Sequence, residues 1–426
     1  MPISEHAVID SMLPLQQLIS CGYFRSQSVM PDESIELVEQ YAYEYGETYD
    51  SYLVTETDRE YFWSRDQRGV VAFCRRGRHI IAAGNLLARP EDRESLLVQL
   101  LEFARTKRWA ISFVNVPRSH TRLFRRHGFE ITKWGEEPII RLQDATWQGQ
   151  DYAWARRQEN FCIRHGVEFC EVKADSLDPV YRDQIVPQLE AVSRAHIAST
   201  LHERELPFFE GQFCPLDLRR RRLFVARHAG QIVAFLVCNP GLSGELWAIE
   251  IYRRFPEAIR GVIPYSIMQT LRTMKSEGVS YVSLSLIPFL RCETAATGDS
   301  RILRPGANFW MQHLNSIFDM RGIYHFKSRF RPDYREMYVA ALPRLTLRST
   351  LSLAFAWKLF HFNPIRWLRR GFAKRGISSE RQNLATPAWR PERVVRELRT
   401  KRTAATTTDR QPQTPAPLAT TVPTTK

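Results

Sequence analysis

Apolar and polar positions between residues 69 and 116 predict two strands, a helix and a further strand. The stretch GVVAFCRRGRHIIAAGNLL (69–87) has two apolar runs separated by Arg76-Gly77, where glycine permits a tight turn. ESLLVQLLEFARTKR (94–108) places its apolar residues at helical spacing. WAISFVNV (109–116) is rich in residues that favour strands. The order is therefore hairpin, helix, strand.

A similar order returns in the second half of the chain. LFVARHAGQIVAFLVCNP (223–240) predicts a hairpin that turns at Ala229-Gly230, and ELWAIEIYR (245–253) predicts a further strand. A helix over 263–278 and a strand over 279–288 follow. We therefore predict an α/β fold of two tandem domains, each a mixed β-sheet flanked by helices, with the cleft within or between them as the default site.

This pattern and the local composition predict the organisation of the chain. The predicted parts are an N-terminal extension (1–35), a first domain (36–170), a second, catalytic domain (171–343), a basic aromatic helical segment (344–381) and a disordered tail rich in Thr, Pro and Ala (395–426).

Charge narrows the expected partners. The 426 residues carry a formal net charge of +14, which favours nucleic acid, anionic lipid or acidic substrates. Segment 344–381 holds nine basic residues and one acidic residue, interleaved with aromatic side chains. This composition predicts contact with a membrane surface. The alternative is a C-terminal helix packed on the body with a solvated basic face.

The cysteines and the apolar runs argue against a disulfide-rich or zinc-binding protein and against a membrane-spanning one. The seven cysteines form no CxxC pair and several lie in apolar runs, which indicates reduced core residues instead of a disulfide or zinc framework. No apolar run approaches the roughly 18 residues of a membrane helix. We expect a soluble body that contacts a membrane peripherally, and no metal.

Several motifs resemble known proteins. RLFRRHGFEI (122–131) resembles the helix–Gly–Phe–strand ending of the acetyltransferase-like (GNAT) fold. Five stretches together resemble the catalytic region of the lysyl-phosphatidylglycerol synthases, the multiple peptide resistance factor family, which is a tandem of this fold. These stretches are WGEEPIIRL (134–142), ELPFFEGQF (205–213), IEIYR (249–253), VSLSLIPF (282–289) and FKSRFRPDYREMY (326–338).

The resemblance implies an activity and partners. Members transfer an aminoacyl group from a charged tRNA to the glycerol hydroxyl of phosphatidylglycerol, a modification linked to antimicrobial peptide resistance. It implies aminoacyl-tRNA as donor substrate, no separate cofactor and an anionic phospholipid as partner. Full-length members carry an N-terminal multi-helix flippase that this sequence does not show. We therefore expect a cytoplasmic protein that acts peripherally on the inner face of the cell membrane.

Two residues of IEIYR are candidates for the chemistry. A lipid hydroxyl that attacks an ester needs a base for its proton and positive charge beside the developing oxyanion. Glu250 stands where the family has Asp, and it is our candidate base or amino-group anchor; Arg253 would stabilise charge. A regular strand would point the two side chains to opposite faces, so a bulge or a strand end is needed to bring them together. The alternative is a structural ion pair at a sheet end.

A second candidate cluster lies in FKSRFR (326–331). If this stretch is extended, Lys327, Arg329 and Arg331 share one face and form a ladder suited to phosphate, while Phe326 and Phe330 face the core. Lys327 would be catalytic, and the two arginines would bind substrate. The alternative is a solvated edge strand.

Further substrate contacts are expected from the resembling motifs. Glu205 and Glu210 flank a Phe pair and would hold the donor's amino group, with Phe213 in the same signature. Ser285 stands where the family has glycine and would narrow the pocket. The run from Arg219 to Arg222 is either a solvated face or an RNA contact.

Two other functions remain open on the sequence. An acyl-CoA N-acyltransferase needs a glycine-rich loop at the start of its long helix, whereas EAIRGVIPYS (257–266) has one glycine followed by Ile263-Pro264. A non-catalytic lipid-binding or anion-binding protein of the same fold is the other alternative.

Overall fold

The computed structural model describes residues 23–26, 32–200, 211–294, 299–314 and 319–356. The strands are β1 (Tyr23–Ser26), β2 (Glu60–Trp63), β3 (Gly69–Arg76), β4 (His79–Ala88), β5 (Ala110–Pro117), β6 (Glu130–Arg141), β7 (Val167–Val172), β8 (Arg222–His228), β9 (Gln231–Gly241), β10 (Leu246–Arg254), β11 (Tyr281–Ser283), β12 (Ile287–Pro288) and β13 (Asp333–Leu342).

The α-helices are α2 (Asp32–Tyr45), α3 (Arg93–Lys107), α4 (Thr121–Arg126), α5 (Ala153–Arg164), α6 (Val186–Ser199), α7 (Val262–Ser276), α8 (Leu303–Phe309), α9 (Met320–Ser328) and α10 (Leu347–Ala356). Short helical turns are η3 (Ser51–Thr55), η4 (Arg118–His120), η5 (Gln150–Tyr152), η6 (Tyr181–Ile185), η7 (Leu242–Gly244) and η8 (Trp310–Leu314).

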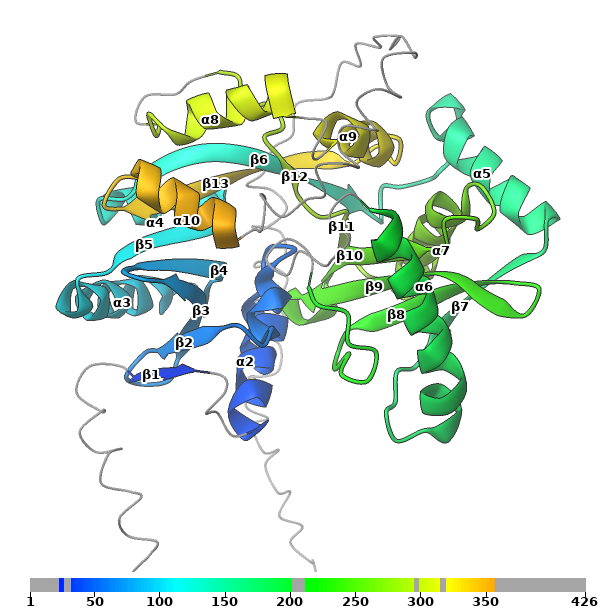
Figure 1. Cartoon of the computed structure of the whole chain (residues 1–426), viewed down its shortest axis with the longest axis horizontal. Coiled ribbons are helices and arrows are strands. Elements are labelled where there is room, and N and C mark those ends of the chain that lie inside the picture. Colours follow the sequence, from blue (N-terminus) through cyan, green and yellow to red (C-terminus); the bar gives the residue numbers. More distant parts are fainter. Residues whose placement is uncertain (1–22, 27–31, 201–210, 295–298, 315–318, 357–426) are drawn as a thin grey trace, which may run out of the picture.

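One mixed sheet of 13 strands runs through the described part of the molecule (Figure 1). Its order is β1-β2-β3-β4-β5-β13-β6-β11-β10-β9-β8-β7, with β12 paired to β6. The pairs β4–β5 and β10–β11 are parallel, and the other pairs are antiparallel. Strand β13 lies in the predicted second domain but pairs with β5 and β6 of the first. The two halves therefore share one sheet.

Helices cover both faces of this sheet. In the first half, α3 and α4 pack on one face and α2 on the other. In the second half, α5 and α7 share one core with the sheet, whereas α6 covers the opposite face. Helices α8 and α10 close a further core over β6 and β13. The predicted mixed α/β fold with flanking helices is confirmed.

Most predicted elements are present. The helices predicted over 94–108 and 263–278 are α3 and α7. The hairpin β8–β9 turns at Ala229 and Gly230, both with positive φ. The strand predicted over 279–288 is shorter, because β11 ends at Ser283 and Ser285 has a φ of 63°. A left-handed residue cannot continue a strand.

The predicted extended ladder over 326–331 is wrong. Lys327 lies in helix α9, Arg329 caps that helix, and the next strand, β13, begins after Pro332. The side chain of Asp319 starts the helix by accepting from the Gly322 N–H at 3.1 Å. Two phenylalanines four residues apart fit one face of a helix as well as one face of a strand, so periodicity alone does not separate the two.

The structure also bears on the cysteines and on membrane-spanning helices. Cys74, Cys162, Cys238 and Cys292 are buried as predicted, but Cys170 and Cys214 are exposed. Within the described ranges, none of the helices has the length and apolar character needed to cross a bilayer.

Candidate active site

Glu250 occupies a β-bulge in the middle of the second half. The register between β10 and β9 shifts between Ile249 and Ile251, so Glu250 is the extra residue. Ile249 packs into the core under α7, whereas Ile251 packs into the core under α6. The bulge therefore changes the face that later residues present. It places Arg253 on the α6 side together with Glu250, as the sequence required for the two to act together.

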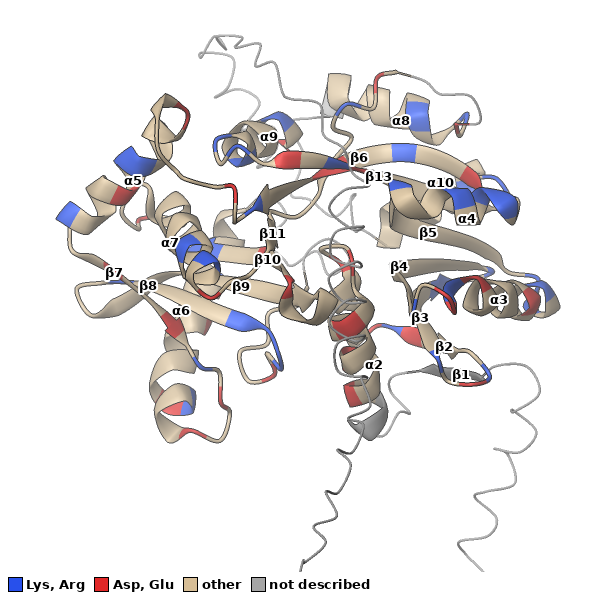
Figure 2. Cartoon of the chain, turned by 180° about the vertical axis from the view of Figure 1, so that it is seen from behind, with Lys and Arg blue, Asp and Glu red and all other residues tan. Residues whose placement is uncertain are grey.

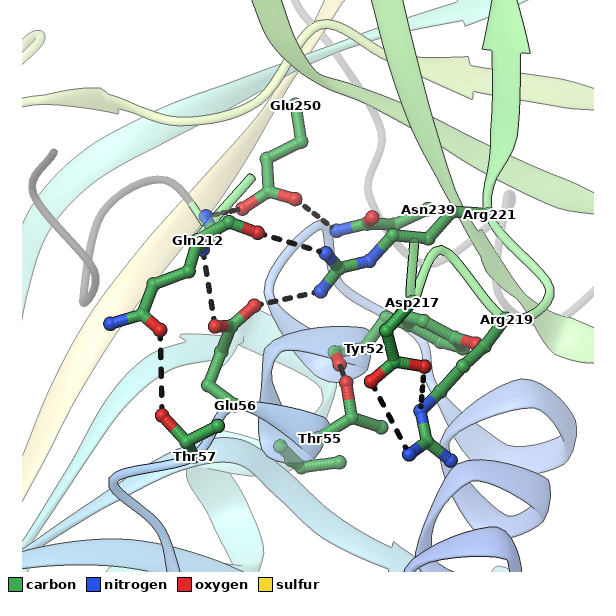
Figure 3. Close-up of polar contacts among 12 residues, drawn as sticks. Tyr52, Thr55, Glu56, Thr57, Gln212, Asp217, Arg219, Arg221, Asn239 and Glu250 are labelled. Atoms are coloured by element: carbon green, nitrogen blue, oxygen red, sulfur yellow. Dashed lines mark hydrogen bonds and ion pairs between the residues drawn. The ribbon is translucent and has the colours of Figure 1, made fainter. Parts of the chain in front are cut away.

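Both carboxylate oxygens of Glu250 accept hydrogen bonds (Figure 3). The donors are the Gly211 N–H and the Asn239 side-chain amide. Burial raises the pKa of Glu250 to about 7; nearby Arg221 opposes this rise, and Glu56 adds to it. A carboxyl group with a pKa near neutrality is suited to take up and release a proton at physiological pH.

A salt bridge between the two halves lies beside Glu250. Arg221 of the second half donates through Nη2 to Oε1 of Glu56 at 2.7 Å, and the Gln212 N–H donates to Glu56 Oε2 at 3.1 Å (Figure 3). A Cβ on Gly211 would lie 2.7 Å from Glu56 Oε1. Only glycine therefore lets the chain pass between the two carboxylates without displacing one of them.

Arg253 faces helix α6 and Phe213. Its Nη1 donates to the Ser193 hydroxyl, and its guanidinium carbon lies 5.3 Å from the Phe213 ring centroid. Phe213 stacks on Phe235 with the ring centroids 4.6 Å apart. The segment 211–213 therefore contacts both Glu250 and Arg253. The structure brings these three predicted residues together through that segment.

Ser285 and Lys327 form the other side of this region. The Ser285 hydroxyl donates to the Ile249 carbonyl at 2.8 Å, next to the bulge. Lys327 is buried, and its Nζ donates to the carbonyl oxygens of Ser285 and Leu286 at 3.0 and 3.3 Å. The positive φ of Ser285 explains why glycine suits this position in the resembling motif. Lys327 reaches the region from a helix and holds the loop after β11.

Arg329 and Arg331 lie outside this region. They line a pocket of about 240 Å³ with Trp154 and Arg157 of α5. The guanidinium carbon of Arg329 lies 4.5 Å from the Trp154 ring centroid, and Arg331 pairs with Asp151 at 2.9 Å. The predicted cluster of 326–331 is thus divided, with Lys327 inside the protein and the two arginines at its surface.

Sequence reasoning missed Glu56, Arg221 and Asn239. Glu56 and Arg221 are 165 residues apart, and no local spacing connects them. Arg221 stood inside an arginine run interpreted as a solvated face or an RNA contact, but it is buried. Glu205 and Glu210 lie outside the described residues, in the segment 201–210 that precedes Gly211. Where side chains are described, no three His, Cys, Asp or Glu residues form a potential metal cluster.

The start of α7 bears on the coenzyme A alternative. Gly261 caps this helix, and Pro264 lies in its first turn. A Cβ on Gly261 would lie 2.6 Å from the side-chain oxygen of Gln158, so α5 covers this helix end. A pyrophosphate needs open backbone amides at such a position. The geometry therefore disfavours coenzyme A binding there.

The comparisons with known proteins agree with the resembling motifs. Residues 39–341 match the family described as phosphatidylglycerol lysyltransferase, C-terminal. The phosphatidylglycerol lysyltransferase of Bacillus subtilis (strain 168) is 22% identical over 305 residues, covering 70% of this chain and 34% of that protein. The Staphylococcus aureus (strain MRSA252) protein of the same name is 20% identical over 330 residues, covering 77% and 38%. The chain thus spans about a third of the length of these relatives.

Solved structures show the same fold. The L-PGS structure from Bacillus licheniformis aligns with a TM-score of 0.64 and 21% identity, covering 78% of this chain and 98% of that one. The C-terminal domain of a putative lysylphosphatidylglycerol synthetase from Agrobacterium fabrum aligns with a TM-score of 0.62 and 21% identity, covering 75% and 95%. The family resemblance predicted from the motifs is confirmed: this chain belongs to the phosphatidylglycerol lysyltransferase C-terminal family.

Proposed function

We propose that this chain is an aminoacyltransferase that moves an amino acid from aminoacyl-tRNA onto the hydroxyl of phosphatidylglycerol or a related membrane lipid. The observation that carries the proposal is buried Glu250, with a pKa of about 7, at a bulge of β10. The family match over residues 39–341 supports the reaction class. Transesterification breaks one ester and forms another, so the donor itself supplies the activated carbonyl and no separate cofactor is needed.

Glu250 is the proposed base. The lipid hydroxyl oxygen attacks the ester carbonyl carbon while Glu250 takes the hydroxyl proton. The bond between that carbon and the ribose oxygen of the tRNA then breaks, and the ribose oxygen takes up the proton that Glu250 received, which returns Glu250 to its carboxylate form. The donors around Glu250, from Gly211 and Asn239, fix the carboxylate in place. Arg253 is the proposed cationic group for the developing oxyanion.

The remaining predicted residues have supporting roles in this proposal. The Ser285 hydroxyl ties the loop after β11 to β10, and Lys327 ties the same loop to α9 through two hydrogen bonds. Phe213 packs under the Arg253 guanidinium. Glu205 and Glu210 remain proposed as contacts for the donor's amino group, because Glu210 directly precedes Gly211 and Glu205 lies five residues before Glu210.

Membrane contact is part of the proposal. On α10, Leu347, Leu351 and Phe355 are 65, 42 and 51% exposed, and their spacing of four residues places them on one face of the helix. The segment 344–381 that contains this helix carries nine basic residues and one acidic residue. Of these nine, Arg344 and Arg348 lie in the described part, whereas residues 357–381 of the predicted segment lie outside it. Exposed apolar side chains in a segment of this basic composition fit the surface of an anionic bilayer. The protein would then work at the cytoplasmic face of the membrane.

The decisive experiment measures transfer of label into lipid. Purified protein is incubated with phosphatidylglycerol vesicles and tRNA charged in turn with each radiolabelled amino acid, and label in the lipid extract is counted. We expect label with one or a few amino acids, a loss of about 10² to 10⁴-fold in Glu250→Gln, and partial activity in Glu250→Asp. Exposed Glu190 provides the matched control, since Glu190→Gln should keep full activity.

Three results would count against the proposal. Full activity of a folded Glu250→Gln protein would remove Glu250 from the chemistry. Absence of label with every charged tRNA, together with saturable coenzyme A binding, would favour an acyl-CoA acyltransferase. Vesicle binding alone, without transfer or coenzyme A binding, would favour a lipid-binding role.

A further inference from the structure

Two adjoining pockets form a basic surface between α5 and α9. The larger, of about 760 Å³, is lined mainly by α5, and the smaller, of about 240 Å³, lies between α5 and α9. They share Trp154 and Arg157. Their described lining residues include one acid, Asp151, and five arginines, which are Arg157, Arg164, Arg260, Arg329 and Arg331. We call these five residues the α5–α9 arginine surface.

The side chain of Arg329 is held in place in this surface. Its guanidinium lies 4.5 Å above the Trp154 ring, and its Nη2 lies 2.6 Å from His325 Nε2. Trp154 in turn meets Phe326 and Phe330 edge-on, at centroid distances of 6.4 and 6.0 Å. An arginine side chain stacked on a fixed aromatic ring is already ordered, so it loses little further conformational freedom when an anion binds it.

The positive charges on this surface are poorly neutralised by the protein. Burial and the neighbouring Arg157 lower the pKa of Arg329. Arg157 and Arg260 are exposed and have no carboxylate partner in the part of the chain that the structure describes. Arg331 does have one, exposed Asp151. An anion placed between these cations would relieve their repulsion and form charge-assisted hydrogen bonds.

We infer that the α5–α9 arginine surface binds the phosphodiester backbone of the RNA donor. The identity of the RNA as donor rests on the proposed function, whereas the affinity for phosphate rests on the arginines. Two adjacent pockets with a shared wall suit a polymer that presents successive phosphates at short intervals better than a lipid headgroup with one phosphate.

The arrangement of the molecule supports RNA over lipid at this surface. Helix α5 lies at one end of the molecule (Figure 2), and the Trp154–Phe326 contact joins its start to α9. Helix α10, with its exposed apolar stripe, lies at the other side of the molecule (Figure 1). A soluble polyanion can therefore occupy the arginine surface while α10 meets a bilayer.

Binding of fluorescently labelled, uncharged tRNA tests the inference. The variant Arg157→Ala/Arg260→Ala changes two exposed side chains, so it should fold, and Arg329→Ala is the second variant. We expect the double variant to weaken tRNA binding about tenfold or more at 0.1 M salt. We also expect it to reduce the slope of log affinity against log salt by about 1.5, because two phosphate contacts are lost.

A matched control removes the same charge elsewhere. Arg105 and Lys107 are exposed at the end of α3, on the opposite side of the molecule from α5. Arg105→Ala/Lys107→Ala should bind tRNA within about twofold of the unchanged protein. An equal loss in this control would mean that net charge, and not the arginine surface, binds RNA, and would overturn the inference.

The remaining outcomes separate this inference from the proposed function. Unchanged tRNA binding in Arg157→Ala/Arg260→Ala and in Arg329→Ala would overturn the inference but leave transfer by Glu250 untouched. Reduced binding to phosphatidylglycerol vesicles with unchanged tRNA binding would also overturn it, because the occupant would then be a lipid headgroup. Tight tRNA binding by Glu250→Gln without transfer, together with weakened tRNA binding by Arg157→Ala/Arg260→Ala, would support both proposals.

Discussion

At the scale of single residues, the environment of Glu250 decides what its carboxyl group can do. It is buried, accepts from Gly211 and Asn239, and has a pKa near 7. The sequence correctly predicted that Glu250 lies on a strand. It also predicted that Glu250 and Arg253 lie on one face only if a bulge or a strand end intervenes, and the bulge is present. Its neighbours could not be predicted, because Glu56 and Arg221 reach it from distant parts of the chain.

The raised pKa of Glu250 predicts a pH dependence of both activity and stability. Activity should rise with pH through about 7, since only the ionised carboxylate accepts a proton. Stability should change in the opposite sense. The folded state binds the Glu250 proton more tightly than the unfolded state, whose pKa is near 4.5, so this group's contribution to the unfolding free energy falls between pH 4.5 and 7.

Urea unfolding at pH 5 and pH 8 would measure this contribution. The fall in unfolding free energy from pH 5 to pH 8 should be smaller in Glu250→Gln than in the unchanged protein, by an amount on the order of 3 kcal/mol at most. An identical pH dependence in both proteins would show that the pKa of Glu250 is not raised. Asp50, whose pKa burial raises to about 6, is unchanged in both proteins and cancels in the comparison.

Ser285 gives a second prediction at this scale. Its φ of 63° costs a residue with a side chain roughly 1 kcal/mol, and its hydroxyl bond to the Ile249 carbonyl offsets about the same amount. Ser285→Gly should therefore leave the melting temperature nearly unchanged. Ser285→Ala keeps the backbone strain and loses the bond, so it should be less stable than Ser285→Gly by about 1–2 kcal/mol. Equal melting temperatures would contradict this account.

At the scale of elements, the spacing of apolar residues correctly predicted which segments are helices and which are strands, except where one spacing fits both. Helices α3 and α7 and the hairpin β8–β9 follow the pattern closely. The stretch 326–331 does not, because Phe326 and Phe330 fit a strand and a helix equally. The consequence for the site is concrete: Lys327 and Arg329 no longer share a face, and only Arg329 reaches the surface.

The salt bridge between η3 and the start of β8 connects elements of the two halves. Arg221→Met should destabilise the protein by about 3–5 kcal/mol, because buried Glu56 and Glu250 would lose their shared cation. Arg65→Met is the control, since its partner Glu102 is 56% exposed and such pairs contribute less than about 1 kcal/mol. Chemical unfolding of both variants checks the difference. Similar losses would mean that burial does not distinguish the two pairs.

At the scale of the whole molecule, different surfaces carry different chemistry. Helix α10, which carries the apolar stripe, lies over the first half of the sheet, whereas α5 of the α5–α9 arginine surface lies at the far end of the second half (Figure 1). Net charge indicated anionic partners but did not say where each would bind. The placement depends on how the helices pack on one sheet, which no local pattern specifies.

The stripe on α10 predicts how the protein meets a bilayer. Leu347→Gln/Leu351→Gln/Phe355→Gln should reduce sedimentation with phosphatidylglycerol vesicles about tenfold or more, because three exposed apolar side chains are lost. Leu177 and Val180 are 85 and 54% exposed elsewhere on the surface and provide the control Leu177→Gln/Val180→Gln. A greater loss in the control than in the triple variant would place the membrane contact elsewhere.

The position of β13 has a consequence for synthesis on the ribosome. This strand, residues 333–342, fills the place between β5 and β6, which are made some 200 residues earlier. Until it emerges, both of those strands present an open edge that other chains can pair with. A nascent chain of this protein therefore cannot finish its N-terminal half first. Expression of that half alone should give aggregates, and a separately supplied β13 peptide should rescue it.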